Sequence, residues 1–161
     1  MTDTPEVEQA FPDAKLAAKD TFRILIMDTV DHVNEVKAAC KNAGLSVVPA
    51  HSLEEAFAFL DEQDHADVII CAAYLEDQSL FEFLKRLRAN AVHKHTMFMT
   101  LALAPGPMAV RTKDSTERAS RLLGADAFIN MPEFDAEKLI AEIKKLLPDE
   151  PLLEKSKQGH E

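Results

Sequence analysis

Short apolar runs alternate along the chain with segments in which apolar residues recur every three or four positions. The central runs are apolar at consecutive rather than alternate positions, which predicts strands buried on both faces of a sheet. The five runs lie at residues 23–27, 45–48, 67–71, 97–101 and 127–129. Helical spacing occurs at residues 30–43, 56–60, 80–88, 116–123 and 136–147. The pattern therefore predicts five successive strand–helix pairs.

Residues that favour helix ends flank these helical segments. Glycine after the last turn predicts a C-cap, and Ser-x-x-Glu before an apolar stripe predicts a capping box. The residues concerned are Gly44 and Gly124 at two helix ends, Ser52 with Glu55 and Ser79 with Glu82 at two helix starts, and Asp135 before the last helix. The helix boundaries thus agree with the apolar periodicity.

Five strand–helix pairs with apolar central strands predict an α/β fold. Right-handed crossovers make it a flavodoxin-like, doubly wound sheet of five parallel strands with five helices, (β/α)5. In such sheets a site lies at the carboxyl ends of the strands. We expect a domain at residues 21–147, between polar tails at residues 1–20 and 148–161.

Composition and charge narrow the function classes. The 161 residues are 47% hydrophobic, enough for one core, and 28 acids against 18 bases give a net charge of −10. This charge argues against nucleic acid and anionic membranes as partners, because both are polyanions. No apolar run is long enough to cross a membrane, and we expect a cytoplasmic protein. Cys40 and Cys71 form no CxxC pair, which predicts two buried reduced thiols.

Three segments carry a resemblance to a known family. ILIMD ends the first strand, ADVIIC forms the third, and GADAFINMP contains the fifth; the turn and strand AGLSVV adds to them. In this order and spacing they resemble the receiver domains of bacterial response regulators, over about residues 22–147. The resemblance implies a domain that takes a phosphoryl group onto an aspartate after the third strand. It also implies Mg²⁺ bound by two acids, with a hydroxyl and a lysine on the phosphoryl oxygens.

Most of these chemical positions have changed in this chain. The resemblance aligns Asp28 with the first acid, Thr29 with the second, Ala72 with the phosphoacceptor, Leu101 with the hydroxyl residue, Met131 with the lysine and Phe128 with the aromatic residue of the fifth strand. Alanine supplies no nucleophile, and three apolar side chains would make the pocket dry and uncharged. We interpret the domain as a degenerate receiver, or pseudo-receiver, without the usual phosphorylation chemistry.

Two features near the fourth strand leave the alignment open. A shift of one residue would place Thr100 instead of Leu101 at the hydroxyl position, because one step along a strand exchanges its faces. The stretch between Leu101 and Gly124 is also longer than such receivers usually have. We expect an extended loop at residues 102–114, with Met108 and Val110 exposed as part of an interaction surface.

The sequence favours neither a metal site nor an enzyme. Asp28 is a weak metal candidate, with Asp31, Glu76 or Asp77 as further ligands, but only one acid is placed with certainty, so neither Mg²⁺ nor another cofactor is expected. His93 and His95 flank Lys94 without a nearby carboxylate or cysteine to complete a metal site. No nucleophile–base pair or glycine-rich phosphate loop is recognisable.

Protein partners remain the favoured ligands. The resemblance implies a partner or homodimer face on the last helix, strand and helix, where Arg118, Arg121 and Lys138 are candidate contacts. We therefore expect a stand-alone receiver-like module that signals by phosphorylation-independent protein contact in a bacterial two-component pathway. One alternative is a small ligand in an apolar pocket lined by Ala72, Leu101 and Met131. Another is phosphorylation of a non-standard acid.

Overall fold

A computed structural model describes residues 21–63, 65–75 and 79–149. The strands are β1 Arg23–Met27, β2 Ser46–Ala50, β3 Val68–Ala72, β4 Met97–Leu103 and β5 Ala127–Met131. The helices are α2 Val30–Asn42, α3 Leu53–Ala58, α4 Ser79–Ala89, α5 Pro107–Arg111, α6 Lys113–Leu122 and α7 Ala136–Leu146, with a π-helical turn at Phe59–Gln63 after α3. The predicted tail at residues 1–20 lies outside the described residues, as does the tail predicted at residues 148–161 except for its first two residues.

All five strands are parallel and form one sheet in the order β2-β1-β3-β4-β5. The order reverses direction at β1, so β1 and β3 lie together at the switch point of the sheet. This confirms the predicted doubly wound α/β fold. The described residues hold six α-helices rather than five, because the segment after β4 contains the additional helix α5.

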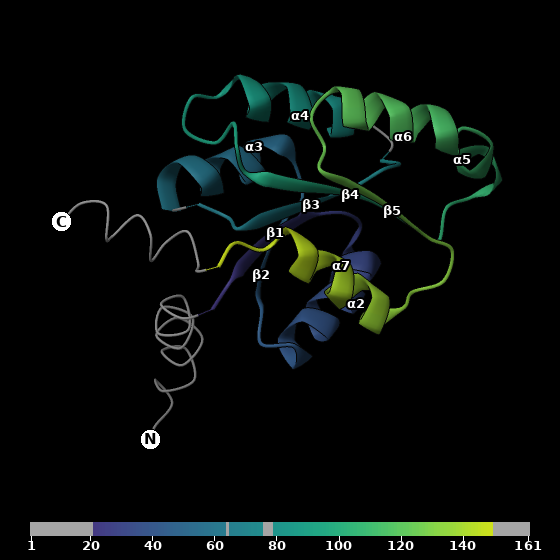
Figure 1. The fold of residues 1–161 in the computed structure, drawn as a ribbon, viewed down its shortest axis with the longest axis horizontal. Coiled ribbons are helices and arrows are strands. Elements are labelled where there is room, and N and C mark those ends of the chain that lie inside the picture. Colours follow the sequence, from purple (N-terminus) through teal and green to yellow (C-terminus); the bar gives the residue numbers. More distant parts are fainter. Residues whose placement is uncertain (1–20, 64, 76–78, 150–161) are drawn as a thin grey trace.

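The core has two halves, one on each face of the sheet. Figure 1 shows α2 and α7 on one face and α3, α4, α5 and α6 towards the other. Alternate residues of each strand enter the two halves: Ile24 and Ile26 pack beneath α2 and α7, whereas Leu25 and Met27 pack beneath α3 and α4. Burial of both faces explains why the strands are apolar at consecutive positions.

Most predicted helix ends are present. The hydroxyl of Ser52 accepts a hydrogen bond from Glu55 N at 3.1 Å, and the carboxylate of Asp135 accepts one from Lys138 N at 3.1 Å. In a capping box the glutamate also accepts a hydrogen bond from the backbone N–H of the N-cap residue. Here Glu55 Oε1 accepts instead from His51 N, one residue before Ser52. Gly44 follows α2 with φ +80°, a conformation that glycine adopts without strain.

Several predicted boundaries are wrong, most clearly around β4 and at the starts of α4 and α6. The predicted extended loop at 102–114 is mostly regular: β4 continues to Leu103, α5 follows, and α6 begins at Lys113 instead of residue 116. Pro107 at the first turn of α5 explains the extra helix, since proline fits that position. Helix α4 begins at Ser79, so this serine lies inside the helix rather than before it.

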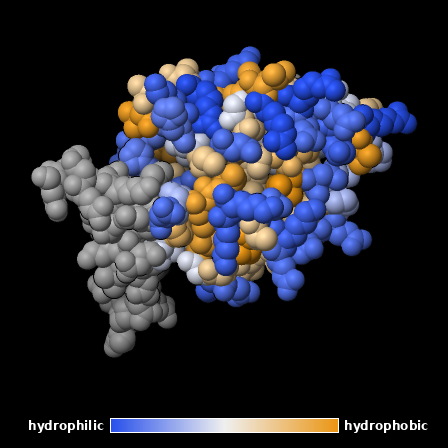
Figure 2. Space-filling model, viewed as in Figure 1, coloured by the Kyte–Doolittle hydropathy of each residue, from blue (hydrophilic) through white to orange (hydrophobic). Residues whose placement is uncertain are grey.

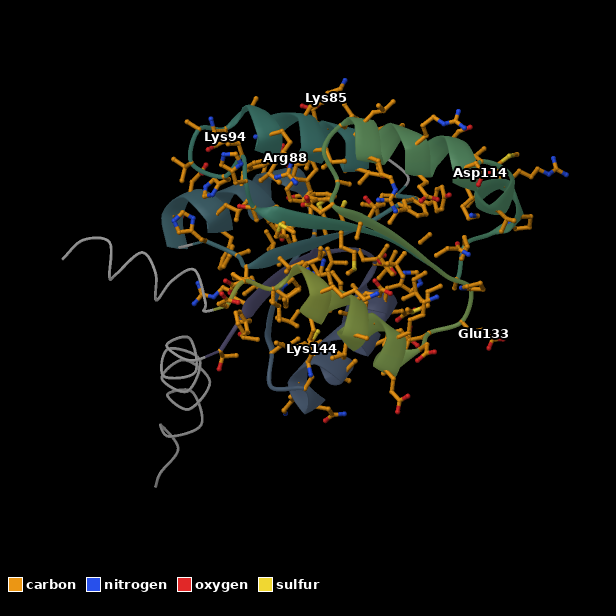
Figure 3. All side chains as sticks on the ribbon, in the orientation of Figure 1. Lys85, Arg88, Lys94, Asp114, Glu133 and Lys144 are labelled. Atoms are coloured by element: carbon orange, nitrogen blue, oxygen red, sulfur yellow. The ribbon has the colours of Figure 1, made fainter. Side chains whose placement is uncertain are left out.

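Arg88 ties the end of α4 to the loops beside it. Its guanidinium donates to Gly124 O from Nε at 3.0 Å and from Nη2 at 2.7 Å, and to Thr96 O from Nη1 at 2.6 Å. It also donates to Lys94 O at 3.0 Å and contacts the Asp126 carboxylate at 3.1 Å. Figure 3 shows Arg88 near the end of α4, close to the turn that contains Lys94. The arginine therefore fixes the turn before β4 and the turn after α6 to the same helix.

Candidate functional site

The residues predicted for a degenerate phosphorylation site lie at the carboxyl ends of the strands. Asp28 and Thr29 follow β1, Ala72 is the last residue of β3, Leu101 lies within β4, and Met131 ends β5. Ala72 pairs directly with Leu101, so the two side chains leave the same face of the sheet. Met131 pairs with Leu103 rather than with Leu101. The strand register thus brings these positions to the same edge of the sheet, but Met131 lies two residues further along the strands than Ala72 and Leu101.

The three apolar positions are packed instead of lining an open pocket. Leu101 and Met131 are each 1% exposed and belong to the core half beneath α2 and α7, and Ala72 is 4% exposed. Leu103, also in this half, lies beside Met131. Side chains therefore fill the space that a ligand would need between Leu101 and Met131, which argues against the predicted apolar ligand pocket.

The register leaves no hydroxyl at the Leu101 position. Thr100 pairs with Cys71 on one side and Phe128 on the other, so its side chain points to the face opposite Leu101. The Thr100 side chain is fully buried, and its hydroxyl has no hydrogen-bond partner. The regular pairing of β3 with β4 therefore excludes the one-residue shift that the sequence left open.

Phe128 lies on the other face of the sheet from Met131. It is 7% exposed and packs in a small cluster with Ala73 and Ala102, against which Tyr74 is half-buried. An aromatic ring at this position is thus directed inward and has no hydroxyl to offer.

Among the described residues at this edge, Asp28 is a buried acid whose carboxylate is held by hydrogen bonds. Its Oδ1 accepts from Thr29 N at 2.6 Å and lies 2.9 Å from His32 Nδ1, while its buried Oδ2 has no hydrogen-bond partner. Burial raises the pKa of the Asp28 carboxyl above its usual range, and the bonds to Thr29 and His32 lower the pKa in part. The local cause is the helix start, since Thr29 is the N-cap of α2 and His32 lies in its first turn.

A hollow of about 440 Å³ opens beside Asp28. It is lined by Met27, Asp28, Thr29, His51, Ser52, Tyr74, Leu75 and Ser79. Ala72, Leu101 and Met131 do not line it, so this hollow differs from the predicted apolar pocket. Tyr74 also lines a second hollow of about 310 Å³ between α4 and α6, and its buried hydroxyl has no hydrogen-bond partner among the described residues.

The candidate metal ligands do not assemble. In the part of the chain that the structure describes, no group of three or more His, Cys, Asp or Glu side chains is arranged to hold a metal ion. Asp31 is exposed, and Glu76 and Asp77 lie outside the described residues. His93 is buried with Nε2 3.3 Å from Asp61 Oδ1, whereas His95 is exposed, so the two histidines are oriented differently.

Both cysteines are buried free thiols, as the sequence predicts. Burial raises the pKa of the Cys40 thiol to about 11. The sulfur of Cys71, next to Ala72, lies 3.6 Å from Ala72 O. Neither thiol is on the surface at the strand edge.

The predicted interaction residues are exposed on three helices. Met108 and Val110 of α5 are 69% and 57% exposed, and Arg118, Arg121 and Lys138 are exposed on α6 and α7. Helices α6 and α7 lie on opposite faces of the sheet and flank the edge strand β5, as Figure 1 shows. Arg121 Nε is 3.1 Å from Glu117 Oε2 within α6.

Some residues at this edge were missed by sequence reasoning. Tyr74, His51 and Ser52 line the hollow beside Asp28, and His51 and Ser52 come from the turn after β2. The available signal was topological, because β2 is a neighbour of β1 and its carboxyl end must open on the same edge. Leu122, 80% exposed at the end of α6, was also missed as an apolar surface residue.

Comparisons with known proteins identify the fold. No protein-family model matches the chain. A transcriptional regulatory protein, TrcR of Mycobacterium tuberculosis, is 32% identical over 129 residues, which cover 78% of this chain and 45% of that protein. The chain thus spans less than half the length of the regulator.

Solved structures agree with this likeness. The chemotaxis response regulator CheY4 of Vibrio cholerae superposes with a TM-score of 0.64 at 23% identity, covering 79% of this chain and 99% of CheY4. A response regulator from Thermotoga maritima gives a TM-score of 0.62 at 24% identity, with 78% and 97% covered. The chain therefore has the CheY-like receiver fold of bacterial response regulators. Among the helices of the described residues, none has the length and apolar character needed to cross a membrane.

Proposed function

We propose that this receiver-like domain is a phosphorylation-independent signalling module that works through protein–protein contact. The observation that carries the proposal is the packing at the strand ends. Ala72 stands where the receiver alignment puts the phosphoacceptor, and Leu101 and Met131 are each 1% exposed in the core. A phosphoryl group there would meet neither a nucleophile nor a cation, and burying its charge among apolar side chains is costly.

The test is incubation of the full chain with Mg²⁺ and acetyl phosphate, followed by intact-protein mass spectrometry. We expect no gain of a phosphoryl group. The variant Thr29→Asp/Ala72→Asp/Leu101→Thr/Met131→Lys restores the receiver chemistry on the same fold, and circular dichroism verifies its folding. An adduct on the unmodified chain, at Asp28, Asp77 or any other acid, would contradict the proposal and favour a non-standard phosphoacceptor.

We further propose a protein partner, or a second copy of this chain, as the ligand of the β5 edge. Exposed apolar side chains on α5 support this, since Met108 and Val110 lie in the apolar stretch at residues 107–110 and would lose water on association. The exposed arginines of α6 and Lys138 of α7 add charge at the same edge. We expect the domain to act in the cytoplasm, with neither nucleic acid nor a membrane as its partner, because of its net charge of −10.

Sedimentation of the full chain at several concentrations tests the homodimer. We expect a dimer to weaken in the Val110→Glu variant and to persist in Val92→Glu, which places the same charge on another exposed valine. If neither variant changes the dimer affinity, α5 is not part of the interface.

A second candidate function is the binding of a small polar ligand in the hollow beside Asp28. It is favoured by two buried groups that line the hollow and have unpartnered oxygens, Asp28 Oδ2 and Tyr74 OH. Amide NMR titration with a panel of small metabolites tests it. Shifts confined to Thr29, His51 and Tyr74 would support this function, and an unresponsive spectrum would remove it.

A further inference from the structure

An apolar hollow, distinct from the hollow beside Asp28, lies between α2 and α7. Its volume is about 420 Å³, and five of its eight lining residues are apolar: Ala39, Ala43, Ala136, Ile140 and Ala141. Alanines on two adjacent helices leave a groove because their side chains are too short to fill the space between the helix surfaces. Figure 2 shows apolar residues gathered on this side of the molecule, with hydrophilic residues around them.

The chain enters the domain at one end of this groove. Phe22, just before β1, packs against the same core half as Ala43, Ile140 and Leu147. The carbonyl of Phe22 accepts a hydrogen bond from Ser46 N at 2.9 Å, only three residues after Ala43. Residues 1–20 are therefore attached next to the groove, and a short tether gives an attached segment a millimolar-range effective concentration.

The sequence of residues 1–20 is complementary to the groove and its surroundings. Its apolar side chains larger than alanine include Phe11 and Leu16, the two nearest to the domain, within a segment of five acids and two bases. The last turns of α2 and α7 carry Lys41 and, on α7, Lys144 and Lys145. Both helices run antiparallel to the strands, so these lysines lie at the end where β1 begins. Figure 3 labels Lys144 on α7 at this face.

The distances allow the contact. From Thr21 back to Leu16 is five residues, which span up to about 17 Å when extended. From Lys144 to Ala136 along α7 is eight residues, or about 12 Å of helix. Leu16 can therefore reach the groove, and Phe11 can also reach it because it is joined to the domain by a longer stretch of chain.

We propose that residues 1–20 dock in the groove between α2 and α7 of the same chain, with Leu16 and Phe11 as apolar anchors and the acids facing the lysines. The segment covers the alanine-lined surface and leaves the β5 edge open. Because part of the attraction is between exposed charges, docking weakens as the salt concentration rises.

Paramagnetic relaxation in the full chain tests this docking. A spin label on Asn42→Cys sits at the groove, and one on Lys85→Cys sits on α4, on the opposite side of the sheet (Figure 3). The native cysteines are buried, so labelling is directed to the new ones. We expect the Asn42→Cys label to broaden amides of residues 10–18 several-fold more than the Lys85→Cys label. The variant Phe11→Asp/Leu16→Asp removes this difference.

Mixing isotope-labelled chains with spin-labelled unlabelled chains separates the possible occupants. Broadening within one chain, absent from the mixture, supports the proposal. Broadening in the mixture would assign the groove to a second copy. Broadening of residues 150–161 instead of 10–18 would assign it to the other end of the chain. Either result, or no broadening at all, overturns the proposal.

Discussion

Replacing Arg88 with alanine is expected to destabilise the domain more than any change at an exposed charge. The guanidinium serves three backbone carbonyls and the Asp126 carboxylate from one partly buried position. Alanine has a high helix propensity, so the helix itself loses little at this position. The effect therefore reports the hydrogen bonds of the guanidinium together with the packing of the side-chain stem against Gly124.

The magnitude follows from which acceptors stay buried. The carbonyls of Gly124 and Thr96 accept part-buried bonds, and each would cost about 1–3 kcal/mol when left without a donor. The Lys94 carbonyl is exposed and can bind water, and the surface pair with Asp126 adds about 0–1 kcal/mol. Together these contributions give an expected loss of about 2–7 kcal/mol, from a total that is typically about 5–15 kcal/mol.

Urea unfolding monitored by circular dichroism measures this loss. Lys85→Ala is the matched control, since Lys85 is an exposed base on the same helix, and it should change stability by less than about 0.5 kcal/mol. Arg88→Lys keeps one charge without the planar fork and should fall between the two. A loss below about 1 kcal/mol for Arg88→Ala would refute the reasoning, because it would mean that water replaces the guanidinium freely.

Three further predictions concern single residues. Gly124→Ala should destabilise the protein in urea unfolding, because Gly124 has φ +111° and an added Cβ would lie 2.8 Å from Arg88 Nε. The loss of stability should be smaller in the Arg88→Ala background. Equal losses in both backgrounds would contradict the clash. Asp28→Asn should stabilise the protein at pH 7. The folded-state pKa of Asp28 is raised, so wild-type stability falls as pH rises from the ordinary pKa of 3.8 through the folded-state pKa. The stability gained by Asp28→Asn should therefore vanish near pH 4. A gain that is larger at pH 4 than at pH 7 would contradict this sign. Cys40, with its pKa near 11, should not react with an aromatic disulfide reagent at pH 8 until the protein unfolds, and rapid labelling of the native protein would show that the thiol is accessible.

The topology was predictable because burial on both faces of the sheet determines the sequence of each strand. Consecutive apolar residues such as Ile24, Leu25 and Ile26 enter both core halves, and this pattern repeats in order along the chain. The ends of the strands were less predictable. Continuation of β4 to Leu103 depends on pairing with Met131, a contact with a distant strand that a local pattern does not contain.

Side-chain partnerships across elements could not be predicted for the same reason. Arg88 and Gly124 are 36 residues apart, and Gly124 alone suggested only a helix end. In the structure this glycine is also required because Arg88 occupies the space of a side chain. Likewise, His51 and Tyr74 reach the hollow beside Asp28 only once β2 and β3 flank β1.

The substitutions that the resemblance implies at the strand edge would be physically coupled to one another. In the receiver chemistry that the resemblance implies, acids and a lysine balance one another around a metal and a phosphoryl group. A lysine left opposite Ala72 would be a buried charge without its partner, and such a charge is strongly destabilising. Met131 removes that charge and packs in the core with Leu101.

Asp28 differs from Ala72, Leu101 and Met131, because it is an ionisable residue at this edge. It remains a buried carboxyl whose charge is compensated only by Thr29 N and His32, and its second oxygen has no partner. Burial of this kind favours the protonated form, which is why the pKa of Asp28 is raised. If the edge had kept a structural role alone, asparagine would serve better at neutral pH. Because it holds this carboxyl, the hollow beside Asp28 is the place at this edge where we most expect ligand binding.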